Sequence, residues 1–241
     1  MRTLWLIMML VVVWSVPARS QCDDNPGPNG LSWDYETEKK SFSIFGFLGD
    51  AFTPRIVLDV KAIRMYVRDG RFVELTRLCG DHRAVDAIFL RSLRIAEYNI
   101  GRALFLSMAA TVEHQNLDVR MPVIESVKLP LTFEEDSLFK ARTRNLPSRL
   151  YSDSPNDEHG DKDKLQHFFG SAYIAYATES REFARSTGNV VEWGEAQFVV
   201  GGANDTRDRR ANKQGEKFGH DLLTVKTLLP SDYLNLPVKI D

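Results

Sequence analysis

Residues 161–223 read DKDKLQHFFGSAYIAYATESREFARSTGNVVEWGEAQFVVGGANDTRDRRANKQGEKFGHDLL, and most of the clustered ionisable side chains of the chain lie in this stretch. Asp161 and Asp163 are good N-cap residues, so a helix is expected to begin at one of them. In that helix Asp163 and His167 share one face, where the carboxylate can orient the imidazole or share a metal ion with it. Apolar residues at helical spacing predict its buried face: Leu165, Phe168, Phe169, Ala172, Tyr176 and Phe183.

A second helix is expected to begin after a break at Gly188, in the segment NVVEWGEAQFVV. It carries Glu192 and Glu195 three residues apart, among apolar neighbours. A buried carboxylate without a partner is costly, so Glu195 is expected to pair with Lys164, an arginine or a metal ion.

A charged loop is expected in residues 203–212, followed by a third helix that begins near Lys213. In this helix Gly215 and Gly219 are one turn apart, which allows another helix to pack closely against them. The three helices are expected to form one bundle with their polar groups turned inward.

The remainder of the chain also favours helices. Residues 55–78 fit either two short helices broken at Gly70 or a β-hairpin, and the ending Leu78-Cys79-Gly80, typical of a glycine-capped helix, favours helices. Residues 83–113 predict one long amphipathic helix at the centre of the packing. Prolines 122 and 130 favour a short strand pair in residues 123–129. The predicted fold class is mainly α, a helical bundle with short extended or β segments in the N-terminal half.

The expected organisation is one globular unit behind a leader. Its parts are a signal peptide at 1–20, a flexible arm at 21–41, a helical N-terminal half at 42–144, a linker or long loop at 145–162, a helical motif region at 163–229 and a C-terminal tail at 230–241. Composition leaves open whether residues 145–162 separate two domains or form a long surface loop.

The N-terminus has the pattern of a secretory leader. A basic Arg2 precedes an apolar run of 13 residues from Leu4 to Val16, and small residues before Gln21 suit cleavage after Ser20. The run is shorter than the roughly 20 residues that span a bilayer. Lipidation at Cys22 is the alternative, but Arg19 and Gln21 do not fit a lipobox.

Cys22 and Cys79 are the two cysteines of the chain. In an exported protein they can form one disulfide that holds the mature N-terminus, while two unpaired thiols remain the alternative. The formal net charge is −2, with 31 basic and 33 acidic residues, so the chain lacks the basic field that binding to nucleic acid needs.

Three short motifs in order resemble those of VanZ-like proteins, and are similar to those of uncharacterised periplasmic lipoproteins that share an Asp-Lys-x-x-His helix start. They are D-K-x-x-H-F at 163–168, E-x-Q at 195–197 and R-D-x-x-A-N-x-x-G-x-x-x-G at 207–219. VanZ-like proteins are embedded in membranes and associated with resistance to glycopeptide antibiotics, whereas this chain has helices of soluble character and a large N-terminal half. The resemblance implies a set of converging residues: Asp163, Lys164, His167, Glu195, Gln197, Arg207, Asp208 and Asn212.

The sequence therefore predicts an exported, soluble envelope protein, periplasmic or secreted, whose polar cluster fixes helix packing while an exposed face binds an envelope component or a small anionic ligand. The alternative is a hydrolase that uses a divalent metal on an anionic lipid or cell-wall substrate. In it His167, Glu195 and Asp208 would hold the metal or act as acid and base. Lys164 or Arg207 would then neutralise the substrate. The sequence contains no HExxH, G-x-S-x-G or CxxC motif.

Overall fold

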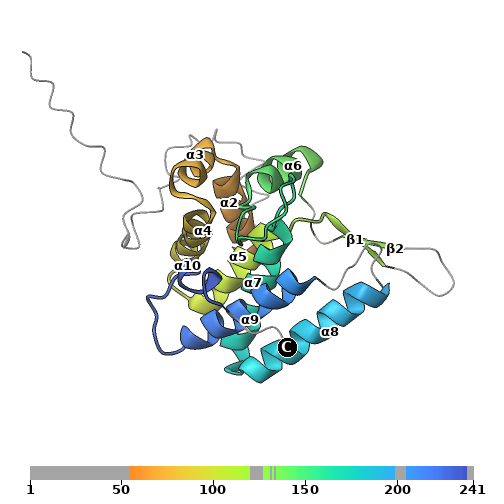
Figure 1. The fold of residues 1–241 in the computed structure, drawn as a ribbon. Coiled ribbons are helices and arrows are strands. Elements are labelled where there is room, and N and C mark those ends of the chain that lie inside the picture. The colour runs from red at the N-terminus through yellow and green to blue at the C-terminus, as the bar shows by residue number, and fades with distance from the viewer. Residues whose placement is uncertain (1–54, 120–126, 131, 133, 199–204, 238–241) are drawn as a thin grey trace, which may run out of the picture.

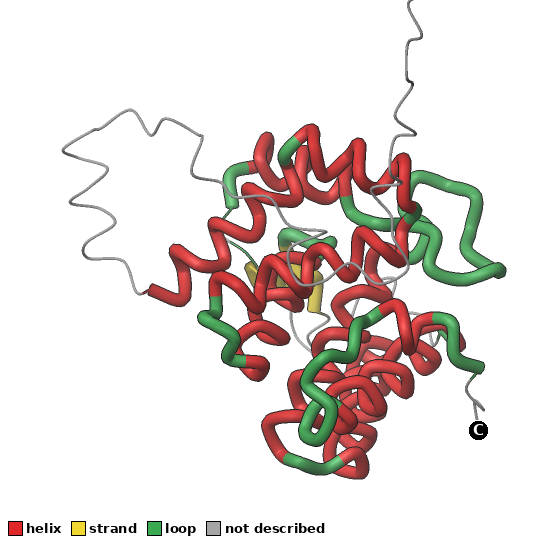
Figure 2. Tube along the Cα trace, turned by 90° about the vertical axis from the view of Figure 1, so that its left-hand side faces the viewer, coloured by secondary structure: helices red, strands yellow, loops and turns green. Residues whose placement is uncertain are grey.

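The computed structural model describes residues 55–119, 127–130, 132, 134–198 and 205–237, and side chains are described outside 117–130 and 190–198. Helices make up most of this part of the chain, as Figure 2 shows in red, with one short strand pair in yellow. The prediction of a mainly α fold is confirmed. The predicted leader, the arm and Cys22 lie outside the described residues.

Residues 55–79 form two helices, α2 (Arg55–Arg68) and α3 (Gly70–Cys79), so the helical interpretation is confirmed. The break falls at Asp69, whose carboxylate caps α3 by accepting a hydrogen bond from the backbone N–H of Arg71. Gly80 ends α3 with φ of 80°, a backbone conformation that favours glycine. Cys79 is disulfide-bonded.

The single helix predicted over residues 83–113 is wrong. The structure has α4 (Asp81–Ile95) and α5 (Ile100–Thr111), joined by a turn in which Glu97 and Tyr98 have φ of 54° and 62°. The Tyr98 backbone N–H donates to the carbonyl oxygen of Leu93 at 2.7 Å, which closes the end of α4. Asn99 then caps α5 by accepting from the backbone N–H of Arg102. Side-chain capping thus restarts the helix in a new direction.

Strands β1 (Asn116–Val119) and β2 (Val127–Pro130) pair antiparallel, with Asn116 opposite Pro130. The predicted strand pair at 123–129 overlaps β2, and residues 120–126 are outside the described part. Helix α6 (Asp136–Asn145) follows, with Glu135 at its N-cap position.

Glu134, just before α6, is surrounded by arginines. It accepts hydrogen bonds from Arg68 and from Arg142, whose side chain is fully buried. Arg142 also donates to the carbonyl oxygens of Ala110 and Val112 at 2.9 and 2.8 Å, where α5 ends. The guanidinium therefore joins α6 to the negative end of α5.

The motif region contains α7 (Lys162–Thr178), α8 (Arg181–Phe198) and α9 (Thr206–Asp221), and α10 (Ser231–Leu234) lies in the predicted tail. Helix α8 continues through Gly188, so the predicted break there is wrong. Helix α9 begins at Thr206 rather than near Lys213, because the Asp205 side chain caps it by accepting from the backbone N–H of Arg207. Phe183 was expected on the buried face of α7 but lies in α8 and is 58% exposed.

Helices α7 and α9 run parallel in direct backbone contact (Figure 1). A Cβ added to Gly215 would lie 2.1 Å from the carbonyl oxygen of Phe168, and one added to Gly219 would lie 2.0 Å from that of Ala172. Both distances are far below any real Cβ contact. The predicted close packing against these two glycines is confirmed.

One hydrophobic core draws residues from both halves of the described chain. At its centre Phe168 stacks on Phe218 with ring centroids 5.4 Å apart, and Phe89 of α4 meets the same Phe218 ring edge-on at 5.3 Å. Leu146 and Leu150 of the predicted linker are also buried in it. Within the described ranges, no helix is both long and apolar enough to span a bilayer.

Candidate functional site

Lys164 is the centre of the candidate site. Its side chain is 3% exposed, and its Nζ lies 2.6 Å from Asp163 Oδ2, 2.9 Å from Asp205 Oδ2 and 2.8 Å from Asp208 Oδ1. The contact with Asp208 is an ion pair. We call these four residues the Lys164 network. One ammonium of α7 thus holds the N-cap and the first turn of α9.

The pKa values of the network show how burial and pairing compete. Burial alone would lower the pKa of Lys164, but Asp163 and Asp208 outweigh it and the pKa is raised. Burial alone would raise the pKa of Asp205, but hydrogen bonds from the Arg207 backbone N–H and from Lys164 lower it to about 2. Burial raises the pKa of Asp208 in spite of the nearby charges of His167 and Lys164. Of the network carboxylates, Asp208 therefore depends most on neighbouring cations to stay ionised.

Arg207 extends the network to the loop before α7. Its Nη1 donates to Asp161 Oδ1 at 2.7 Å and its Nη2 to Asp205 Oδ2 at 2.7 Å. Asp161 is fully buried, and its other oxygen accepts from the backbone N–H groups of Leu150 and Tyr151 at 3.2 and 3.3 Å. The predicted linker is therefore fixed to the start of α9.

His167 lies at the edge of the network. Its side chain is 16% exposed, and its Nε2 is 3.5 Å from Asp208 Oδ1. The carboxylate beside the His167 ring is therefore that of Asp208 in α9, while Asp163, the expected partner, pairs with Lys164. The carboxylate that can orient this imidazole comes from a different helix than the sequence suggested.

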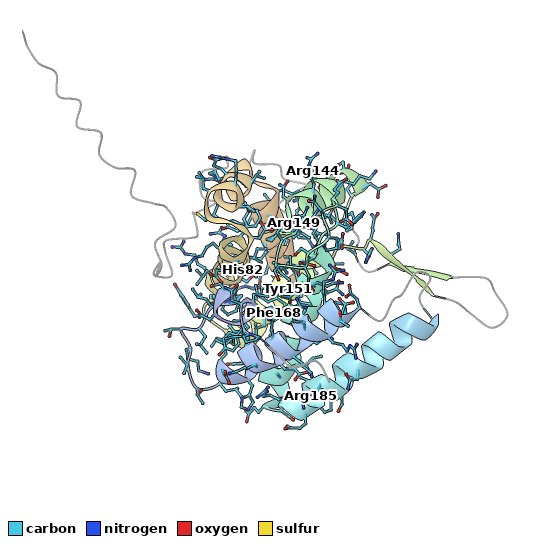
Figure 3. All side chains as sticks on the ribbon, viewed as in Figure 1. His82, Arg144, Arg149, Tyr151, Phe168 and Arg185 are labelled. Atoms are coloured by element: carbon cyan, nitrogen blue, oxygen red, sulfur yellow. The ribbon has the colours of Figure 1, made fainter. Side chains whose placement is uncertain are left out.

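Polar contacts continue along α9, one turn at a time. Ser171 Oγ donates to Asn212 Oδ1 at 2.8 Å, and Asn212 lies within α9 rather than ahead of it. A Cβ at Gly188 of α8 would lie 3.3 Å from Asn212 Nδ2, so α8 also approaches here. One turn further Arg185 of α8 pairs with Glu216 at 3.2 Å, and burial raises the pKa of that glutamate. Figure 3 labels Arg185 at this edge of the molecule.

Of the eight residues expected to converge, six have described side chains. The structure brings together Lys164, Asp163, His167, Asp208, Arg207 and, one turn along, Asn212. Glu195 and Gln197 lie in α8, but their side chains are outside the described part, so the predicted pairing of Glu195 with Lys164, an arginine or a metal ion stays a prediction.

Sequence reasoning missed Asp161, Asp205, Ser171 and Glu216 as members of this interface. A signal for Asp205 was present, since Asp-Thr-Arg is a good helix start and its carboxylate caps α9. The charged run around it was instead interpreted as a loop.

The three carboxylates of the network already share one cation. The ammonium of Lys164 already occupies the position between the three carboxylates where a shared cation would sit. In the described chain no group of three or more His, Cys, Asp or Glu side chains is placed to hold a metal ion. Of the predicted metal set His167, Glu195 and Asp208, the structure shows one pair, His167 with Asp208.

The low pKa of Asp205 makes stability depend on pH. A carboxyl whose pKa is lower in the folded than in the unfolded chain stabilises the fold above its unfolded pKa near 4, and the stabilisation is lost as pH falls toward the folded value. From a folded pKa of about 2 we expect a contribution to stability on the order of 2 kcal/mol.

Asp205→Asn keeps the N-cap and removes the charge. Urea unfolding should show wild type to be more stable than Asp205→Asn at pH 6, and this difference in stability should vanish near pH 2. A difference that is constant across this range would contradict the assignment.

No protein-family model, curated protein or solved structure matches this chain.

Proposed function

We propose that this chain is an exported, non-catalytic envelope protein in which the Lys164 network fixes the packing of α7 against α9 while an exposed face binds an envelope component or a small anionic ligand. The observation that carries the structural role is the ammonium of Lys164 within 2.9 Å of three carboxylates on a side chain that is 3% exposed. This ammonium occupies the place among the carboxylates that a metal ion of a hydrolase would need, which supports a structural role.

A second observation supports a structural role. Arg207 and Asp161 join the network to backbone groups of the loop at 150–151, so each charge is used in holding a segment of the fold. A buried ion pair adds to stability only when its remaining hydrogen-bonding groups are satisfied, and Asp161 and Asp205 meet that condition.

Metal analysis tests the proposal against the hydrolase alternative. We expect the purified protein to contain no stoichiometric divalent metal, and its thermal unfolding midpoint to stay the same after treatment with EDTA. Elemental analysis and calorimetry on the same sample measure both. A bound ion at one per chain, lost on chelation or in His167→Ala and Asp208→Asn, would favour the hydrolase. Glu158→Gln, an exposed carboxylate outside the network, is the matched control.

The proposed export of the protein depends on the leader, and it is tested by a separate experiment. Expressed with its leader in a bacterial host, the mature protein is expected in the periplasm or medium with Gln21 as its first residue, because small residues before that position suit signal peptidase. Intact-mass measurement and N-terminal sequencing determine this. Retention of Met1, or a lipid on Cys22, would contradict it.

A further inference from the structure

A pocket of about 420 Å³ opens at the start of α4, on its side that faces α10. His82 and Arg83 of α4 form one wall, and residues between Thr227 and Asn235 form the other. Figure 3 labels His82 well apart from Arg185, which lies in α8. The pocket therefore uses none of the residues of the Lys164 network.

The two walls are joined through a buried carboxylate. Asp86, one turn after His82, is fully buried and accepts a hydrogen bond from the Ser231 backbone N–H at 2.8 Å. Its other oxygen is 3.4 Å from Arg83 Nη1. The far wall is also held internally, since the Leu229 backbone N–H donates to Asp232 Oδ2 at 2.9 Å. These contacts form the pocket before any ligand arrives, which lowers the cost of ordering on binding.

A backbone carbonyl fixes the tautomer of His82. Its Nε2 is 2.7 Å from the carbonyl oxygen of Leu150, and since a carbonyl can only accept, Nε2 carries the hydrogen. In the neutral ring Nδ1 is then a hydrogen-bond acceptor.

The charges of the lining disfavour an ionic ligand of either sign. The lining has one cation, Arg83, on one wall and one carboxylate, Asp232, on the other, so Arg83 repels a cation and Asp232 repels an anion. Apart from Leu229 the remaining lining groups are hydroxyls of Thr227 and Ser231 and the amide of Asn235. This mixture of donors and acceptors suits a molecule whose groups both donate and accept.

We propose that this pocket binds a neutral saccharide. Sugar hydroxyls donate to Asp232 and His82 and accept from Arg83 and Asn235, and one apolar side chain contacts a ring face. The volume lies within the range of about 300 to 1,000 Å³ typical of small-ligand pockets and is large enough for a mono- or disaccharide. This inference does not depend on the role of the Lys164 network, so either can fail alone.

The test is a titration of the full-length protein, isotopically labelled, with N-acetylglucosamine, its β-1,4-linked disaccharide and glucose, followed by two-dimensional NMR. Shifts are expected at His82, Thr227 and Asn235. Loss of one hydrogen bond weakens binding by roughly two- to tenfold, so Thr227→Val and Asn235→Ala should each raise the Kd by that factor. Thr178→Val, which removes an exposed hydroxyl on α7, is the matched control and should bind as wild type.

Three results would overturn the proposal. The first is the absence of saccharide shifts at these residues at millimolar ligand. The second is unchanged affinity in both pocket variants, which would place binding elsewhere. The third is that inorganic phosphate, titrated in parallel, shifts the same residues more strongly than any sugar, which would make the ligand an anion. Circular dichroism of each variant verifies that its helices are retained.

Discussion

Lys164→Met is expected to destabilise the protein by roughly 3 to 5 kcal/mol, the cost of removing one partner from a buried ion pair. Methionine fills similar space but leaves Asp163, Asp205 and Asp208 facing one another without their shared cation. Urea unfolding monitored by circular dichroism measures the loss. In a chain of this length it corresponds to a fall in the thermal midpoint on the order of 10 °C.

Two further variants identify the cause of that loss. Lys61→Met on the exposed face of α2 is the matched control and is expected to change stability by less than about 0.5 kcal/mol. Adding Asp208→Asn to Lys164→Met removes the carboxylate whose pKa burial already raises, and should restore part of the stability. A loss below about 1 kcal/mol for Lys164→Met would show that the network contributes little to the fold.

Gly219→Ala is expected to cost several kcal/mol, more than any gain in helix propensity. Alanine is better than glycine in a helix by about 1 kcal/mol, but its Cβ would lie 2.0 Å from the backbone carbonyl oxygen of Ala172. A backbone atom cannot rotate away as a side chain can, so α7 and α9 must separate and the contacts around Phe168 and Phe218 are lost. Gly215→Ala should behave in the same way, because its Cβ meets Phe168 at 2.1 Å.

Gly70→Ala provides the control for this pair. A Cβ at this first residue of α3 would meet no atom within 4 Å, so the substitution should be neutral or slightly stabilising. Chemical unfolding of the three variants side by side measures the contrast. Equal stability of Gly219→Ala and Gly70→Ala would disprove the close helix contact.

The sequence predicted the fold best where local chemistry decided it. Asp69 begins α3 by capping it, and Gly80 ends α3 with a positive φ that favours glycine. Both signals can be read from residue type. At the break between α4 and α5 the cap residue Asn99 is a readable signal, but the left-handed conformations of Glu97 and Tyr98 are not, because neither residue is a glycine.

In the candidate site, too, some features could be predicted from residue type and others could not. Sequence reasoning identified Lys164, His167 and Asp208 as polar groups of one region, and the structure places them together. Their partners could not be assigned, because pairing depends on which face α9 presents to α7. Starting α9 at Lys213 instead of Thr206 left Asp205 and Asp208 in a loop. Gly215 and Gly219 predicted the contact between α7 and α9 more reliably than the charged residues predicted their own partners.

The parallel arrangement of α7 and α9 has a consequence for the order in which the chain folds. Phe168 and Gly215, which touch across this contact, are 47 positions apart in the sequence, with the whole of α8 between them. Loop-closure entropy makes such a pairing slower than the local pairing of α7 with α8. A chain emerging from a ribosome or a translocation channel therefore exposes the Phe168 face until residues 206–221 are also released. During that interval it is open to aggregation and to capture by chaperones.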